Sequence, residues 1–193
     1  LPQGAHWLSW LHAGVMRYAH GNIEGAVQAW ETSLRLRPSA WALRNLAVHA
    51  LHQKQTDRAL ELYPAAHRQL PDLLPLAIEC LHALLENARA PLALDLIGRL
   101  PEGIRFHGRI RALEARARLD TGDLAGAEAI LTGAIEVPDI REGANVLSDL
   151  WYLLKERQEA AREGVPITPE LQAKVRRECP PPPRLDFRMM AEI

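Results

Sequence analysis

One feature constrains the fold more than any other: a small residue recurs along the chain at a nearly constant interval. The residue is alanine, and 33, 34 and 34 residues separate its four occurrences, which are Ala26, Ala59, Ala93 and Ala127. Each alanine is followed four residues later by a bulky side chain on the same face of a helix, namely Trp30, Tyr63, Ile97 or Leu131. Such a period is typical of a stack of repeated supersecondary units.

A second small and apolar pattern precedes each alanine, which indicates that every unit contains two helices. Between the helices lie Gly21-Asn22, Lys54-Gln55, Asn87-Ala88 and Gly122-Asp123. Gly or Asn there supplies the left-handed conformation that ends a helix. The second helices are followed by prolines, which stop them: Pro38, Pro71, Pro101 and Pro138. We therefore predict an all-α chain with about four helix pairs, over residues 6–37, 40–70, 73–100 and 107–137.

The units resemble the tetratricopeptide repeat family, and the first unit matches it most fully. The matching residues are Trp10, Gly14, Tyr18, Gly21, Asn22, Ala26, Trp30 and Pro38. The third unit departs from the pattern with Pro91, which is tolerated in the first turn of a helix. The resemblance implies a right-handed α-superhelix that binds other proteins.

The period ends after residue 138, and the chain beyond it has a different organisation. We expect a repeat array over residues 1–138, a helical cap over 139–178 and a proline-led tail over 179–193. The cap consists of two helices, near residues 144–163 and 168–178, because a terminal repeat needs a cover over its apolar edge. Thr168 and Pro169 form a typical helix start.

The tail opens with four consecutive prolines at 180–183, a stiff extended segment. It continues with Leu185, Phe187, Met189 and Met190, which are too apolar to remain unpacked. Two alternatives are open: the tail lies back along its own array, or it crosses to another chain.

Residues 139–151 are similar to part of a bacterial family of uncharacterised tetratricopeptide proteins. They contain the stretches Asp-Ile-Arg-Glu-Gly and Leu-Ser-Asp-Leu-Trp. In that family the resemblance implies an N-terminal β-sandwich related to galactose mutarotase, which is absent from this sequence. The accessory domain of a larger carbohydrate-active protein is therefore the alternative function.

Charge and cysteine content narrow the partners and the compartment. With 23 basic and 24 acidic residues, the net charge of -1 gives no field that would attract nucleic acid or an anionic membrane. The two cysteines, Cys80 and Cys179, follow no zinc, redox or disulfide spacing, which favours reduced thiols and a cytoplasmic location. No apolar run is long enough to span a bilayer. The chain starts at Leu1, so we expect it to be a fragment of something longer.

No motif in the sequence carries catalytic chemistry. His49 with His52, and Glu79 with His82, have a spacing that allows metal binding, but surface histidines on amphipathic helices explain it as well. Acidic residues lie beside basic ones along the helices instead of forming a carboxylate pair. We expect no enzyme activity, no metal and no cofactor.

The concave face of such an array is lined by the first helix of each pair. Its candidate binding residues are Tyr18, Trp41, Arg44, Asn45, His82, Arg109 and Arg116. Arginines bind carboxylates or phosphates through paired hydrogen bonds, and aromatic rings supply flat contact area. The alternative is a solvated groove in which the arginines pair with nearby acidic residues. Trp7, at a helix start, either packs against a missing N-terminal domain or covers the first hairpin.

The predicted function is a non-catalytic module for protein interaction or self-association. The partner is another protein or the chain's own N-terminal domain, and a homo-oligomer is possible.

Overall fold

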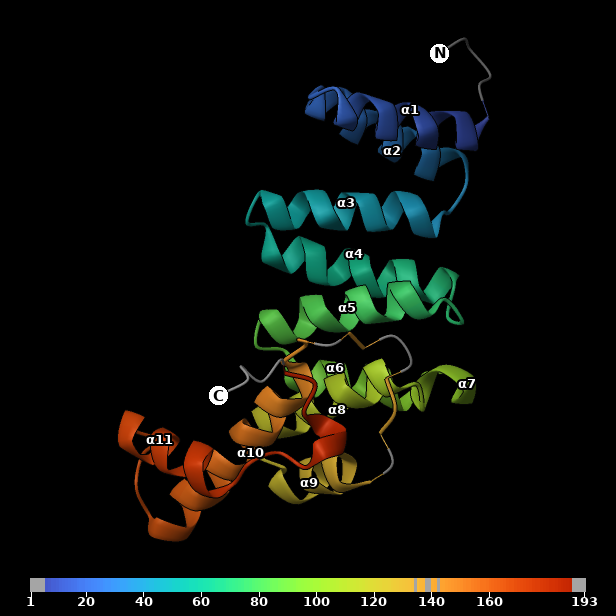
Figure 1. The fold of residues 1–193 in the computed structure, drawn as a ribbon. Coiled ribbons are helices and arrows are strands. Elements are labelled where there is room, and N and C mark those ends of the chain that lie inside the picture. Colours follow the sequence, from blue (N-terminus) through green and yellow to red (C-terminus); the bar gives the residue numbers. More distant parts are fainter. Residues whose placement is uncertain (1–5, 134, 138–139, 142, 189–193) are drawn as a thin grey trace. The chain divides into compact units, whose positions relative to one another are not determined.

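The computed structural model describes residues 6–133, 135–137, 140–141 and 143–188. All regular structure in this part of the chain is helical, which confirms the all-α class (Figure 1).

The helices repeat at the interval that the alanines predict. The first helices of the pairs are α1 (Trp7–Ala19), α3 (Ala40–His52), α5 (Leu74–Glu86) and α8 (Gly108–Asp120). The second helices are α2 (Ile23–Leu36), α4 (Thr56–Gln69), α6 (Ala90–Gly98) and α9 (Leu124–Thr132). In both series successive helices start 33, 34 and 34 residues apart. The predicted positions of all eight helices are confirmed, whereas the sequence analysis missed the short helix α7 (Glu102–Arg105).

The turn inside each predicted pair contains one residue with positive φ, again at the same repeat position. These residues are Gly21 (φ 79°), Lys54 (58°), Ala88 (57°) and Gly122 (83°). In the third turn the left-handed residue is Ala88 and not Asn87, whose φ is -106°. Two of the four turns therefore adopt this conformation without Gly or Asn.

The chain divides into two compact units, Leu1–Asn87 and Ala88–Ile193. The division falls inside the third predicted pair, so α5 belongs to the first unit and α6 to the second. The domain boundaries predicted at residues 138 and 178 stay predictions.

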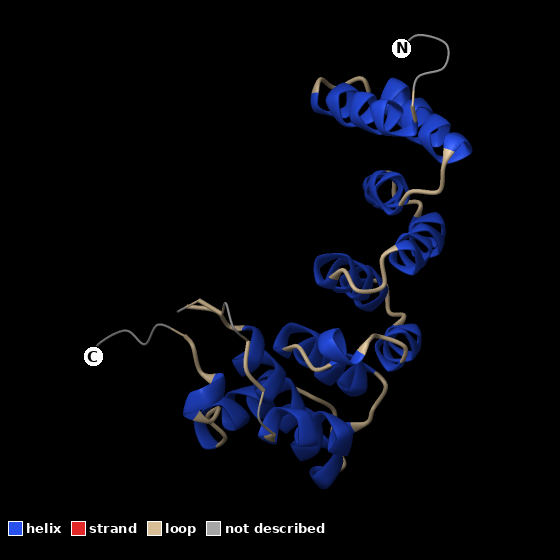
Figure 2. Cartoon of the chain, turned by 90° about the vertical axis from the view of Figure 1, so that its right-hand side faces the viewer, coloured by secondary structure: helices blue, strands red, loops and turns tan. Residues whose placement is uncertain are grey.

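In the first unit each helix packs against the next along the chain, from α1 to α5. Figure 2 views α3, α4 and α5 nearly end-on, with α3 and α5 on one side and α4 on the other. The core between the first two pairs consists of Leu11, Ala26, Trp30, Ala42 and Leu46. A Cβ on Gly14 would lie only 2.3 Å from Trp30 Nε1, which explains the small residue at this position.

In the second unit α8 packs against α6 and α9, and the predicted cap helices follow as α10 (Val146–Glu163) and α11 (Pro169–Glu178). Helix α10 packs against α8, α9 and α11. The main core consists of Ala112, Ala115, Leu119, Ala127, Ile130, Leu131, Ile135, Leu147, Leu150, Leu154 and Leu185. Pro138, Asp139 and Glu142, which the sequence analysis used, lie outside the described residues.

The described part of the tail lies on its own unit. A short 3-10 helix, η1 (Pro183–Leu185), packs beside α10, and Leu185 is fully buried (Figure 1). Of the two alternatives, the structure thus has the tail folded back. Met189 and Met190 lie outside the described residues.

Candidate functional site

The first helices of the first unit form one continuous face, because side chains bridge each of them to the next. Tyr18 of α1 reaches α3, where its Oη lies 2.9 Å from Nδ1 of His52. Arg44 of α3 reaches α5 through a two-point ion pair with Glu79, at 2.8 and 3.0 Å. We call the exposed side of α1, α3 and α5 the first-helix face.

Trp41 is the most conspicuous residue of this face. It lies in the first turn of α3, directly before Ala42 of the core, and 47% of its surface is exposed. At the equivalent position of the first unit's opening helix, 33 residues earlier, lies Leu8, which is also exposed. Val15 is a further exposed apolar residue of α1. Exposed aromatic and aliphatic side chains on a packed helix scaffold provide contact area at low entropic cost.

Arg44 is not available as a free cation. Its guanidinium donates to both carboxylate oxygens of Glu79, and Nη1 also lies 3.4 Å from Oδ1 of Asn45. The hydrogen bonds to Glu79 raise the pKa of Arg44 above its ordinary value. The arrangement matches the alternative of an arginine paired with an acidic neighbour, and it holds α3 and α5 at a fixed spacing.

Tyr18 and the histidines of α3 form a small aromatic group. The Tyr18 ring contacts the ring of Trp30 at 5.5 Å and, edge-on, that of His49 at 6.3 Å. His52 is occupied by the Tyr18 hydroxyl, and Glu79 by Arg44. His82 is exposed on α5, and its Nδ1 lies 3.8 Å from a carboxylate oxygen of Glu86. No group of three or more potential metal ligands is found within the described ranges.

The remaining two candidates, Arg109 and Arg116, lie on α8 of the second unit. Arg116 pairs with Asp120 at 2.8 Å, one helical turn away. Arg109 is exposed at the start of the helix, and its backbone N–H donates to Nδ1 of His107, the residue that caps α8. Leu11 and Ala112, which we expected on the concave face, are buried core residues instead.

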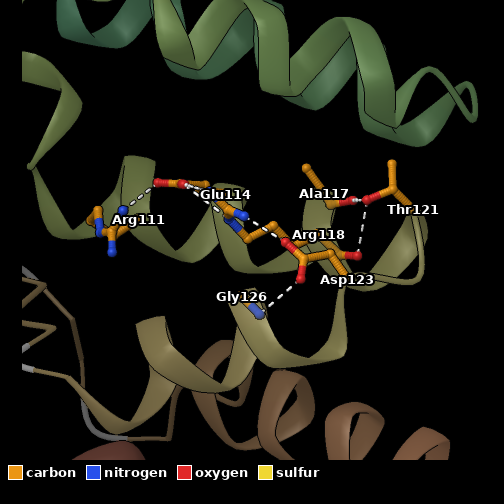
Figure 3. Close-up of polar contacts among 7 residues, drawn as sticks. All are labelled: Arg111, Glu114, Ala117, Arg118, Thr121, Asp123 and Gly126. Atoms are coloured by element: carbon orange, nitrogen blue, oxygen red, sulfur yellow. Dashed lines mark hydrogen bonds and ion pairs between the residues drawn. The ribbon is translucent and has the colours of Figure 1, made fainter.

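The sequence analysis missed a charge network in the second unit (Figure 3). The carboxylate of Glu114 is buried, with 4% of its side chain exposed, and it accepts hydrogen bonds from Arg111 and Arg118. Arg118 also pairs with Asp123, whose other oxygen accepts from the backbone N–H of Gly126 at 2.9 Å. The network therefore links α8 to the first turn of α9.

The physical state of this network follows from its hydrogen bonds. Those to Glu114 and then Asp123 raise the pKa of Arg118. The bond from the Gly126 amide, followed by that from Arg118, lowers the pKa of Asp123. All of these groups are thus charged and mutually satisfied at neutral pH, as a structural network requires.

A repeat alignment would have found this network. Arg111, Glu114 and Arg118 lie 101 residues after Trp10, Ala13 and Arg17 of the first pair. Charged residues at core positions of a repeat indicate a buried ion network, but only after the register has been assigned.

Trp7 covers the first hairpin. It packs against the first core, its carbonyl accepts a hydrogen bond from Ser33 Oγ at 2.9 Å, and the guanidinium of Arg37 lies 5.2 Å from its ring. Of the two roles expected for Trp7, these contacts supply the second.

Comparison with known proteins adds no family: no protein-family model matches the chain, and no curated protein matches it. The tetratricopeptide resemblance and the resemblance of residues 139–151 stay predictions. In the described part of the chain, no helix combines the length and apolarity that crossing a membrane requires.

Proposed function

We propose that the chain is a non-catalytic, tetratricopeptide-type module that binds another protein through the first-helix face of its first unit. The observation that carries the proposal is the exposed Trp41 on a face whose helices are tied together by Tyr18–His52 and Arg44–Glu79. A large ring in solvent is unfavourable unless a partner covers it, and rigid neighbours reduce the entropic cost of binding.

The chemistry of the face indicates what it recognises. Leu8, Val15 and Trp41 offer apolar contact area, whereas the arginine of the face already has its carboxylate. We expect a partner segment that inserts an apolar or aromatic side chain beside Trp41, and not one held by its terminal carboxylate.

Site-specific photo-crosslinking tests this proposal. A photoreactive phenylalanine analogue replaces Trp41 in one chain and Gln28, an exposed residue of α2, in the control chain. We expect a discrete adduct from position 41, identified by mass spectrometry, and none of that mass from position 28. Identical adducts from both positions, or none from position 41, would contradict the proposal.

A further inference from the structure

The tail of the second unit is recognised by its own side chains in the way that a bound peptide would be. Leu185 has no exposed surface and lies in the core formed by Leu131, Leu147, Leu150 and Leu154 of α9 and α10. Phe187, two residues further on, is partly buried against the same core. Together these two side chains anchor the segment on an apolar surface.

Polar contacts fix the direction of the same segment. Arg184 donates to the carbonyls of Leu131 and Thr132, at the C-terminal end of α9, where carbonyls lack helical partners and a cation is favoured. The Phe187 carbonyl accepts from the backbone N–H of Gly143. Residues 184–187 thus supply a cation, an apolar anchor and a backbone acceptor in a fixed order.

The chain before the prolines is held independently of the segment beyond them. The Cys179 carbonyl accepts from Trp151 Nε1 at 3.0 Å, and Cys179 packs on the core of Tyr152, Leu171 and Val175. Helices α10 and α11 therefore keep their contacts whether or not residues 184–187 are docked. The prolines between the two anchors act as a hinge, and Pro182 has the extended polyproline conformation (φ -56°, ψ 147°).

From these contacts we infer that the surface of α9 and α10 is a docking site for the arm of a second copy of this chain, residues 183–188. The contacts are the same whether the arm comes from its own unit or from another, so exchange costs little apart from the loss of effective concentration. A hinge of four prolines spans roughly 12 Å and bends poorly, which favours an arm that reaches outward. The inference deepens the proposed interaction function by naming a partner, but it uses a different unit from Trp41.

A labelled peptide with the sequence of residues 179–188 tests the site directly. Fluorescence anisotropy measures its binding to the parent chain and to the double variant Arg184→Ala, Leu185→Asp, whose own arm no longer docks. We expect the peptide to bind the variant at least about tenfold more tightly, because the parent's arm competes from within the chain. The control peptide carries Asp in place of Leu185 and should bind neither chain.

The outcomes separate clearly. A variant that keeps its helical circular dichroism but does not bind the peptide overturns the inference. If the variant loses helix, recovery of the signal on adding the peptide supports the site, and no recovery overturns it.

Sedimentation equilibrium then tests whether a second copy supplies the arm. The mass of the parent chain should rise with concentration toward that of a dimer, whereas the variant should remain a monomer. A parent that is monomeric at every concentration overturns arm exchange even if the peptide binds. None of these measurements depends on Trp41, so a failure here is distinguishable from a failure of the crosslinking experiment.

Discussion

The turns of the first and fourth helix pairs differ from the turn of the second pair in chemistry, although the backbone conformation is the same. Gly21-Asn22 and Gly122-Asp123 combine a glycine at positive φ with a side chain that caps the next helix, each accepting from a backbone N–H at 2.9 Å. Lys54-Gln55 reaches positive φ without glycine, and Gln55 makes no capping hydrogen bond. A non-glycine residue in this conformation costs about 1 kcal/mol.

The difference shows which interaction determines the turn. Since Lys54 adopts the left-handed conformation against its own preference, the packing of α3 on α4 must impose it. Favourable turn chemistry then adds stability, but it does not determine the hairpin. Four experiments sharpen or break this comparison.

The largest effect should come from the packing itself. Ala26 and Ala59 are both fully buried, one in a hairpin with a favourable turn and one in a hairpin without. We expect Ala26→Leu and Ala59→Leu to cost similar amounts, about 1–3 kcal/mol each, because both force two close helices apart. Urea unfolding monitored by circular dichroism measures both. A much smaller cost at Ala59 would show that the second hairpin is not closely packed.

Removing the caps should have the next largest effect. Asn22→Ala removes one capping hydrogen bond and should cost about 1 kcal/mol. Asp123→Ala removes the equivalent bond and also an ion-pair partner of Arg118, so it should lower the melting temperature further than Asn22→Ala does. Equal shifts in melting temperature would mean that the network around Arg118 adds nothing to the cap.

Exchanging the left-handed residues should give effects of opposite sign. Lys54→Gly relieves the unfavourable φ and should stabilise the chain by about 0.5–1 kcal/mol, whereas Gly21→Ala should destabilise it by about 1 kcal/mol. Hydrogen exchange of the amides in α2 and α4 locates each change. Destabilisation by Lys54→Gly would indicate that the lysine side chain makes a contribution of its own.

The smallest effect should come from adding a cap where there is none. Gln55→Asp places a short carboxylate at the start of α4, where the backbone N–H groups attract it, and should gain about 0.5 kcal/mol. Thermal melting measures the gain. The variant Gln55→Ala is the control and should not stabilise the chain.

Period and spacing were sufficient to predict the helices. The alanines at 33 and 34 residue intervals locate all eight paired helices, since a repeat imposes the same local structure wherever its small and bulky residues recur. The short helix α7 was missed, because four residues carry too little periodicity to be recognised.

The candidate site was harder to predict. The sequence correctly indicates that Arg44 and Arg116 have acidic neighbours, but the partner of Arg44 lies 35 residues away on another helix. Lys54 and Ala88 could not be predicted as left-handed residues from their own preferences, because tertiary packing determines them. The docking of Leu185 likewise depends on α9 and α10, which the tail sequence does not encode.

The buried carboxylate of Glu114 has a consequence for misfolding. Repeat chains can pair a helix with the wrong neighbour, since every unit presents a similar apolar face. If α8 packed against a helix other than α9, Glu114 would still be buried, but Arg118 would lose Asp123 and could not complete the network. An incompletely compensated buried charge is costly, so we expect this single carboxylate to discriminate against mispaired arrangements that the apolar residues alone would permit.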